Sequence, residues 1–323
     1  MNTRVDPATF RALKERLLGA KRVLIGTHLN PDGDALGSAL GFSLWLDGLG
    51  VSNEVLDHHE APRNLRFLPG IDRIRKEPTE TADFGVVLDL DATHRLGSTQ
   101  PYFDAIPFAL IDHHIPHESP GEIRIVHTDA AATALIVATM LADNGEEITP
   151  EMATCLYTGI VTDTGSFRFR NTSPEALATA AMLLERGADF VTVSEHVFQS
   201  RRLASARLLG CLLESMSIEE NGRLAWGSIS QRNFTEAEAS DDDTEGFVNE
   251  LLAIDTVQVA ALLRETKPGV VRCSIRSRGT VDVAEAVRVF GGGGHRNAAG
   301  CNFDLPLPEA EARLVDCLRQ TLS

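Results

Sequence analysis

The chain has 323 residues, enough for about two domains, and its apolar content of 43% and charged content of 24% are ordinary for a globular protein. Its formal net charge of −16 argues against broad affinity for long nucleic acid, which rests on many Lys and Arg contacts to phosphate, and leaves small anionic ligands open. We see neither a signal peptide nor an apolar run long enough for a bilayer, and the five cysteines are scattered, so we expect a cytoplasmic protein with reduced thiols and no membrane partner.

The first half of the chain alternates strand and helix patterns. Apolar runs predict strands at 22–27, 53–56, 84–90 and 108–111, and helical patterns cover 35–46, 133–141, 152–160 and 173–186. This order predicts an α/β fold whose sheet is mostly parallel, with helices on both faces. Helical patterns then continue to about residue 217, and we interpret 191–217 as a connector.

A smaller α/β region is predicted after the connector. An Asn-Gly turn predicts a hairpin over 217–226, strand patterns follow at 257–263 and 270–275, and helices are expected at 282–289 and 308–318. The acidic stretch 240–246 lacks the ligand spacing of a calcium loop, so we interpret it as a solvated loop or helix start. The predicted domains are therefore 1–190 and 218–323, with the connector between them.

The segment His28-Leu29-Asn30-Pro31-Asp32-Gly33-Asp34 places one imidazole and two carboxylates directly after the first predicted strand. Carboxylates crowded at a strand end repel one another unless they are solvated or a cation lies between them. A solvated acidic loop would account for the two aspartates, but it explains neither His28 nor the position at a strand end. The motif therefore favours a metal site.

Three further apolar segments end in side chains of the same kind. They lead into Asp89, into Asp112-His113-His114 and into Asp163. Because ligands of open α/β sheets bind at the carboxyl ends of the strands, one crevice could gather all of these groups. Two divalent ions sharing a bridging carboxylate would use the whole set, and donors of this kind suit Mn²⁺ better than a cysteine-rich zinc site. The predicted metal ligands are His28, Asp32, Asp34, Asp89, His113 and Asp163.

These motifs and their order resemble the DHH phosphoesterase family. The C-terminal run Gly291-Gly292-Gly293-Gly294-His295, with Arg276-Ser277 upstream, is similar to that family's DHH-associated domain. The length and spacing are closest to the bacterial nano-RNase and pAp phosphatase branch, the bifunctional oligoribonucleases. The resemblance implies a DHH catalytic domain, a smaller DHH-associated substrate-binding domain and an active site in the cleft between them. It also suggests a homodimer.

The resemblance implies a role for each matching residue. His28 and Asp32 would hold one Mn²⁺, Asp89 would bridge to a second, and the second would also be held by Asp34, His113 and Asp163. The catalytic residues would be Asp89 and His114, with His114 facing the substrate phosphate. Whether His114 donates a proton to the leaving group or stabilises the transition state stays open.

The four consecutive glycines carry a large conformational entropy cost, so folding must gain something from them. Glycine lets the backbone approach a ligand and point several N–H groups at an anion. A linker is the alternative, but a linker would not usually end in His between two structured patterns. Arg95 could also bind phosphate through its guanidinium, or be a solvated surface charge. The predicted substrate-binding residues are Arg95, Arg276, Ser277, Gly291, Gly292, Gly293, Gly294 and His295.

One further tripeptide and two single histidines are not assigned to the predicted metal site. Asp57-His58-His59 also spells D-H-H, but it precedes Asp89, whereas the family's motif follows that aspartate. It also leads into Glu60-Ala61-Pro62-Arg63, which reads as a surface loop, so we do not expect the tripeptide to be functional. His117 and His127 lack a position at a strand end and are interpreted as surface or hydrogen-bonded core histidines.

The function that the resemblance implies is metal-dependent hydrolysis of short oligoribonucleotides, such as dinucleotides, to mononucleotides, and of pAp to AMP. The alternative is a phosphodiesterase of cyclic dinucleotides such as c-di-AMP, or of their linear products pApA and pGpG. It would use the same metal site, and the residues named above do not exclude it. A processive single-strand exonuclease is disfavoured, because two Trp and two Tyr offer no evident stacking platform for long nucleic acid.

Overall fold

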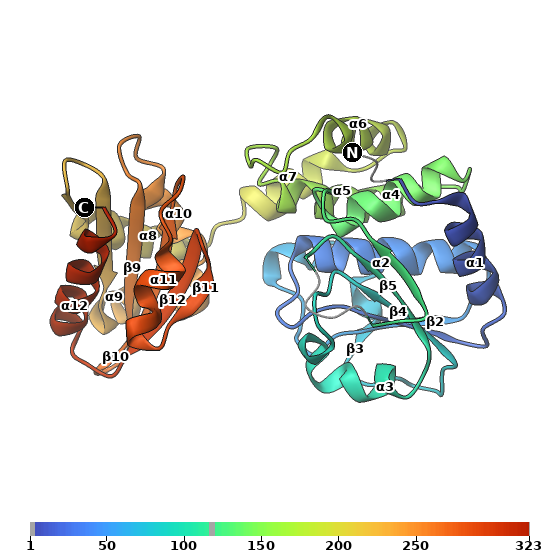
Figure 1. The fold of residues 1–323 in the computed structure, drawn as a ribbon, viewed down its shortest axis with the longest axis horizontal. Helices are drawn as coiled ribbons and strands as arrows, with labels where there is room; N and C mark the ends of the chain where they lie inside the picture. Colours follow the sequence, from blue (N-terminus) through green and yellow to red (C-terminus); the bar gives the residue numbers. More distant parts are fainter. Residues whose placement is uncertain (1–3, 116–119, 323) are drawn as a thin grey trace. The chain divides into compact units, whose positions relative to one another are not determined.

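The computed structural model describes residues 4–115 and 120–322, which leaves His117 outside the described residues. The chain divides into two compact units, Met1–Ser200 and Arg201–Ser323, and each is considered by itself (Figure 1). The boundary divides the segment that was expected to be a connector. Helix α7 (Phe190–Phe198) belongs to the first unit, and α8 (Leu203–Ser215) belongs to the second.

The N-terminal unit contains a six-stranded sheet in which every neighbouring pair of strands is parallel. This confirms the α/β prediction. The strand order is β3-β2-β1-β4-β5-β6, with bounds β1 (Val23–Gly26), β2 (Asn53–Leu56), β3 (Ile74–Arg75), β4 (Phe84–Leu88), β5 (Phe108–Asp112) and β6 (Ile123–Val126). The two edge strands, β3 and β6, were not predicted, because they are short and only partly buried.

Alternate residues of the central strands face two different cores. In β1, Val23 and Ile25 belong to the large core that also contains α2 and α5, whereas Leu24 belongs to a smaller core with Phe103 of α3. Helices therefore cover both faces of the sheet, as predicted (Figure 1). Their bounds are α1 (Pro7–Leu18), α2 (Gly33–Gly48), α3 (Gln100–Asp104), α4 (Thr133–Asp143), α5 (Pro150–Asp163) and α6 (Pro174–Glu185).

Helices α2 and α5 cross at glycines. A Cβ atom on Gly37 of α2 would lie only 2.4 Å from the carbonyl oxygen of Cys155 in α5. A Cβ on Gly159 of α5 would lie 2.5 Å from Cβ of Ala134 and 2.8 Å from a carboxylate oxygen of Asp34. The two glycines therefore let three helices approach closely, and this brings the first turn of α2 beside α5.

The C-terminal unit has a mixed six-stranded sheet in the order β11-β12-β10-β9-β8-β7. Only the β8–β9 pair is parallel. The predicted hairpin is confirmed, with Asn221 at φ 56° in its turn. The element bounds are β7 (Ser217–Glu219), β8 (Leu224–Ile229), α9 (Gln231–Ala237), α10 (Phe247–Leu252), β9 (Val259–Lys267), β10 (Val270–Ser277), α11 (Val283–Val287), β11 (Gly293–His295), β12 (Ala298–Phe303) and α12 (Leu307–Gln320).

The acidic stretch of this unit forms a short 3₁₀ helix, Asp241–Thr244. Of the two expectations, a solvated loop or a helix start, the helix start is confirmed, but Asp243 is buried and accepts two hydrogen bonds from Arg202. Asp241 in turn binds Arg264 and Arg272. Asp241 and Asp243 therefore neutralise arginines within the unit.

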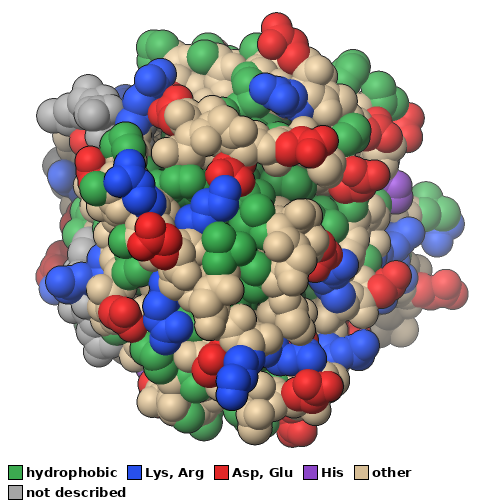
Figure 2. Space-filling model, turned by 90° about the vertical axis from the view of Figure 1, so that its right-hand side faces the viewer, with side chains coloured by type: hydrophobic (Ala, Val, Ile, Leu, Met, Phe, Trp, Pro, Cys, Tyr) green, Lys and Arg blue, Asp and Glu red, His purple; other side chains and the backbone are tan. Residues whose placement is uncertain are grey.

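The surface mixes charges of both signs. Figure 2 shows acidic and basic side chains interspersed with apolar ones on one face of the molecule. Among the described residues, no helix combines the length and the apolar character needed to cross a membrane.

Candidate metal centre

The first predicted ligands lie in the turn between β1 and α2. His28 is buried, and its Nδ1 lies 2.8 Å from the carbonyl oxygen of Leu29, which directs Nε2 the other way. Asp32 caps α2, since its carboxylate accepts the N–H groups of Asp34 and Ala35, each at 3.0 Å. The sequence motif therefore folds as a strand, a tight turn and a capped helix.

Asp34 is buried and accepts hydrogen bonds from the first turn of α4. Its two oxygens lie 2.6 Å from the backbone nitrogen of Thr133 and 2.8 Å from that of Ala134. A helix N-terminus favours a carboxylate. Burial and the charges of Asp89 and Asp163 nevertheless raise the pKa of Asp34 well above its usual range.

Asp89 follows β4 and lies at the centre of the cluster. Its backbone is left-handed, with φ 58°, and its carboxylate accepts the Thr133 hydroxyl at 3.0 Å. Nε2 of His28 lies 3.4 Å from its Oδ2. Burial would raise the pKa of Asp89, but the hydrogen bond from His28 and the charges of the neighbouring histidines lower it below its ordinary value. Asp89 is therefore better suited to stay ionised than Asp34.

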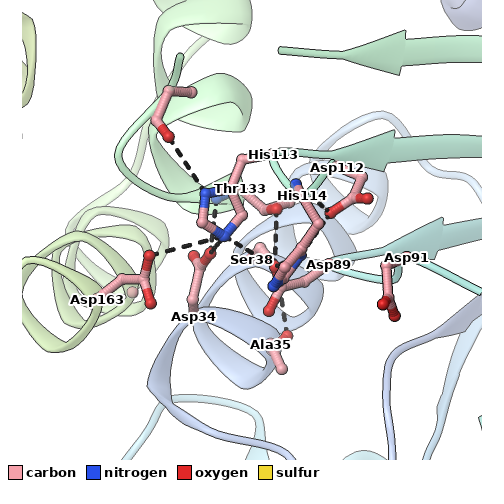
Figure 3. Close-up of polar contacts among 12 residues, drawn as sticks. Asp34, Ala35, Ser38, Asp89, Asp91, Asp112, His113, His114, Thr133 and Asp163 are labelled. Carbon is pink, nitrogen blue, oxygen red and sulfur yellow. Dashed lines mark hydrogen bonds and ion pairs between the residues drawn. The ribbon is translucent and has the colours of Figure 1, made fainter. Parts of the chain in front are cut away.

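His113 and His114 follow β5 and point to different partners (Figure 3). Nδ1 of His113 lies 3.2 Å from the carbonyl oxygen of Ala130, and its Nε2 lies 3.5 Å from Asp89, 3.6 Å from Asp163 and 3.8 Å from Asp34. A carbonyl acceptor at one ring nitrogen leaves the other free as a metal ligand.

His114 turns back onto Asp112, with its Nδ1 2.9 Å from Oδ1 of that residue and 3.5 Å from Asp89. The hydrogen bond to Asp112, opposed by burial and helped by the charge of Asp89, raises the pKa of His114 to about 9. The ring is more than a third exposed, so it is accessible to a ligand.

Asp163 reaches the cluster from the end of helix α5. Grouping it with residues at strand ends was therefore wrong, since 159–162 is the last turn of a helix. Burial, with the charges of Asp89 and Asp32, raises the pKa of Asp163 to about 6, although His113 opposes the shift.

The six predicted ligands come together in overlapping groups whose ligand atoms lie within 4.8 Å of one another. One group is His28, Asp32 and Asp89, and another is Asp34, His113 and Asp163. A third joins Asp89 to His113 and His114. Burial first, and then repulsion between carboxylates, raises the pKa values of Asp34 and Asp163. Divalent cations would offset both effects, so the oxygen and imidazole donors here fit such ions.

Only some of the predicted substrate-binding residues of the C-terminal unit line a common pocket. Gly291, Gly292 and Gly293 line a pocket of about 360 Å³. Arg276, Ser277, Gly294 and His295 are not among its lining residues. Two arginines in the wall, Arg264 and Arg272, were not predicted from the sequence. Arg272 lies within the predicted strand 270–275, and Arg264 directly follows the predicted strand 257–263. The lining residues are Arg264, Arg272, Cys273, Phe290, Gly291, Gly292, Gly293, Gly300, Cys301 and Asn302.

The glycine run is partly a strand. Gly293–His295 is edge strand β11, paired with β12, although a loop was expected. Packing requires glycine at two positions, because a Cβ would lie 2.5 Å from the Gly300 carbonyl at Gly292 and 2.4 Å from the Ala298 carbonyl at Gly294. The packing of the backbone in this sheet thus explains why glycine is needed at two of the four positions.

The remaining predicted substrate residues have partners of their own. Ser277 is buried, donates its hydroxyl to Val281 and accepts a hydrogen bond from Asn297. Arg95 forms an ion pair with Asp91 at 3.0 Å. Arg276 donates to a neighbouring backbone carbonyl, while its side chain stays partly exposed.

Asp57-His58-His59 directly follows β2, and its two histidines are half-buried while its aspartate is buried. Asp57 is 1% exposed. Its Oδ1 accepts the N–H of His59 at 2.8 Å, and its buried Oδ2 has no hydrogen-bond partner among the described residues. Burial therefore raises the pKa of Asp57 to about 7, although the N–H of His59 and the charge of His28 oppose the shift.

This shift predicts a pH dependence of stability that Asp57→Asn removes. Between an ordinary pKa of 3.8 and about 7, the folded carboxyl keeps a proton that the unfolded chain has lost. The free energy of unfolding of the wild type therefore falls as pH rises through this range. The difference in the free energy of unfolding between Asp57→Asn and the wild type should therefore shift by about 1 kcal/mol or more in favour of the variant from pH 5 to pH 8, as measured by urea unfolding. An equal difference at both pH values would contradict this assignment.

Two residues that support the site were not singled out from the sequence. Thr133 binds Asp34 through its N–H and Asp89 through its hydroxyl. Asp112 orients both the backbone and the ring of His114. Thr133 was visible only as the start of a predicted helix, and Asp112 only as the first letter of D-H-H.

Comparison with known proteins gives the same two-part division. Residues 22–160 match the family model described as "DHH family, N-terminal domain", and 227–323 match "DHHA1 domain". A Thermus thermophilus protein named bifunctional oligoribonuclease and PAP phosphatase is 35% identical over 93% of this chain and 90% of its own length. A Streptococcus mutans protein with the same name, marked probable, is 28% identical over 91% and 93%. The crystal structure of an exopolyphosphatase-related protein from Bacteroides fragilis superposes with a TM-score of 0.90 at 28% identity, covering 100% of this chain and 97% of that one.

Proposed function

We propose that this chain, which belongs to the DHH family, hydrolyses short oligoribonucleotides to mononucleotides and pAp to AMP. The observation that carries the proposal is the convergence of the six predicted metal ligands into two groups, with His114 beside Asp89. The relatives named as oligoribonuclease and PAP phosphatase support the choice of substrate, since they match this chain over nearly its whole length.

The proposed cofactor is a pair of divalent ions, Mn²⁺ by preference. His28 and Asp32 would hold one ion, Asp34, His113 and Asp163 the other, and Asp89 would lie between them. Bound divalent ions of this kind lower the pKa of a water to form a hydroxide and neutralise charge on phosphoryl oxygens. Asp34 and Asp89 are buried, which strengthens their electrostatic interactions, whereas Asp32 stays exposed to water.

His114 is proposed to face the phosphate that is hydrolysed. Asp112 fixes its ring through Nδ1, so Nε2–H is left to donate. A protonated imidazole can give its proton to the leaving ribose hydroxyl or stabilise charge on the phosphoryl group. Asp112 thereby acts through His114, by holding its ring and its protonated form.

The glycine pocket of the C-terminal unit is proposed to bind nucleotide, with Arg276, Ser277 and His295 as further contacts. Arg264 and Arg272 lie in its wall, and a phosphate there would share them with Asp241, to which both are paired. The acidic net charge elsewhere disfavours long RNA, so small nucleotides should bind best. We place the protein in the cytoplasm, because its five cysteines are free, and include a homodimer in the proposal.

Arg276→Ala should raise KM for a dinucleotide several-fold while kcat changes little. A residue that contacts only a remote part of the substrate contributes binding that is equal in the ground and transition states. Initial rates over a range of dinucleotide concentration check this prediction. An unchanged KM would remove Arg276 from the proposed binding surface.

The proposed function is tested by supplying the metal-loaded protein with a panel of phosphate esters. Purified protein would be incubated with Mn²⁺ and pAp, a linear RNA dinucleotide, a 24-residue RNA or cyclic di-AMP, and the products separated by chromatography. We expect fast hydrolysis of pAp and of the dinucleotide, with little change in the 24-residue RNA and the cyclic compound. EDTA should stop all turnover.

Other results would lead to other conclusions. Preference for cyclic di-AMP would favour the cyclic-dinucleotide phosphodiesterase alternative, which uses the same metal site. Preference for the 24-residue RNA would contradict the selection of short substrates. Failure to hydrolyse any of the four would reject the enzymatic proposal.

A further inference from the structure

Asp57-His58-His59 has the same local construction as Asp112-His113-His114. In each case the aspartate is buried at the carboxyl end of a parallel strand and its Oδ1 accepts the N–H of the second histidine, at 2.8 and 3.1 Å. In each case Oδ2 is buried without a partner among the described residues. The histidine rings lie 4.3 Å apart in the first tripeptide and 4.5 Å apart in the second.

The two tripeptides lie on opposite sides of the central strand pair β1–β4, because β2 borders β1 and β5 borders β4. The second directs its histidines at the carboxylate cluster. The first does not, and none of its residues belongs to a metal-ligating group among the described residues. Its imidazoles instead hold backbone on two neighbouring loops.

His59 holds the metal turn. Its Nδ1 accepts the N–H of Asn30 at 3.1 Å, at the left-handed residue of the His28–Asp34 motif, where φ is 53°. A backbone N–H can only donate, so Nδ1 of His59 acts as an acceptor and the ring is neutral. The hydrogen bond fixes a conformation that an L-residue adopts at a cost.

His58 holds the loop that follows β4. Its Nδ1 accepts the N–H of Ser98 at 3.0 Å and lies 2.8 Å from the Ser98 hydroxyl. At Gly97, with φ 59°, a Cβ would lie 3.0 Å from the His58 ring and 2.4 Å from the Leu29 side chain. Glycine therefore lets this loop pack against both the tripeptide and the metal turn.

A third hydrogen bond joins the two loops to one another. The N–H of Leu29 donates to the Arg95 carbonyl at 2.7 Å. The Leu29 carbonyl binds Nδ1 of His28, and this contact aims Nε2 at Asp89. A continuous chain of contacts thus runs from β2, through both loops, to the orientation of one predicted ligand.

We infer that Asp57-His58-His59 is a positioning element that sets the geometry of the His28–Asp32 metal site. The tripeptide ties the metal turn to the loop after β4, and Asp57 fixes the turn that presents the two imidazoles. The element acts on one metal site and not the other, because Asp34 and Asp163 belong to α2 and α5 and His113 is held by the Ala130 carbonyl. The inference rests on the proposed two-ion centre.

The test measures metal binding without substrate. Metal-free, full-length protein is titrated with Mn²⁺ by calorimetry, using wild type, His59→Asn and His59→Leu. Asn and Leu have nearly the same shape, but only Asn keeps an acceptor for the Asn30 N–H. We expect His59→Leu to weaken one of two Mn²⁺ sites by about tenfold or more, the usual cost of losing a residue that orients a ligand. The other site should be unchanged, and His59→Asn should bind both ions within about threefold of wild type.

Two further variants complete the comparison. His58→Leu breaks the other end of the same element and should weaken the same site, so it replaces His59→Leu if that variant does not fold. His196→Leu removes an exposed imidazole from α7 and should leave both sites intact.

The positioning role is overturned if His59→Asn and His59→Leu weaken Mn²⁺ binding equally. It is also overturned if His59→Leu and His58→Leu both bind Mn²⁺ like the wild type. Loss of both sites together in a folded Leu variant also overturns it, since the effect would not be confined to one ion. Wild-type protein that binds fewer than two Mn²⁺ rejects the two-ion centre itself. The two failures are therefore distinguishable.

Discussion

Hydrolysis of a linear RNA dinucleotide should fall by more than about 10³-fold when Asp89 is replaced by alanine, because this carboxylate is proposed to bridge the two ions and groups both with His28 and Asp32 and with His113 and His114. Among the carboxylates of the cluster that carry a resolved pKa shift, Asp89 alone has its pKa lowered. It also contacts His28, His113 and His114, so its removal leaves three imidazoles without their common partner. Initial rates with saturating Mn²⁺ check the prediction.

The matched control is Asp72→Ala, which removes an exposed carboxylate from the same unit and should leave turnover unchanged. Asp89→Asn keeps the shape of the side chain and should be nearly as inactive, which separates loss of charge from a packing defect. Near-normal turnover by either Asp89 variant would contradict a bridging carboxylate.

Gly37→Ala should destabilise the N-terminal unit by about 1–3 kcal/mol, the usual cost of inserting a methyl group into a packed core. The new Cβ would lie 2.4 Å from the carbonyl oxygen of Cys155 and 3.0 Å from the nitrogen of Gly159, and both are backbone atoms of α5. Helices α2 and α5 must then separate. Because Asp34 begins α2 and Asp163 ends α5, activity should fall together with stability.

Thermal unfolding and dinucleotide hydrolysis measure the two effects. We expect the unfolding midpoint of Gly37→Ala to drop by about 2–10 °C. Gly48→Ala, on the same helix, has no atom within 4 Å of its Cβ and should be neutral or stabilising by up to about 1 kcal/mol. If Gly37→Ala unfolds at the same temperature as the wild type and Gly48→Ala, the two helices do not cross closely at Gly37.

Short-range patterns predicted most of the N-terminal sheet. The apolar runs before His28, Asp89 and Asp112 are β1, β4 and β5, and their parallel pairing follows from the alternation of strands and helices. Parallel pairing then brings the strand ends to one edge of the sheet. The edge strands β3 and β6 lacked such runs, because they bury only part of their surface.

The C-terminal unit was harder to predict at its binding surface. The glycine run reads as a loop, but pairing of β11 with β12 converts part of it into a strand. The approach of Arg264 and Arg272 to the glycines depends on the order of β9, β10 and β12, which joins residues far apart in the chain. Local composition does not specify that order.

The sequence by itself determined which residue types could hold metal, since imidazoles and carboxylates recur immediately after apolar segments. Only the tertiary structure decided how two of them act. Asp163 ends a helix that was predicted in part, and it reaches the other ligands because Gly37 and Gly159 let α2 and α5 cross closely. Asp57 is buried because β2 lies inside the sheet, between β1 and β3, and its histidines hold loops instead of metal. Both outcomes depend on contacts between segments distant in sequence, and local patterns carry no information about such contacts.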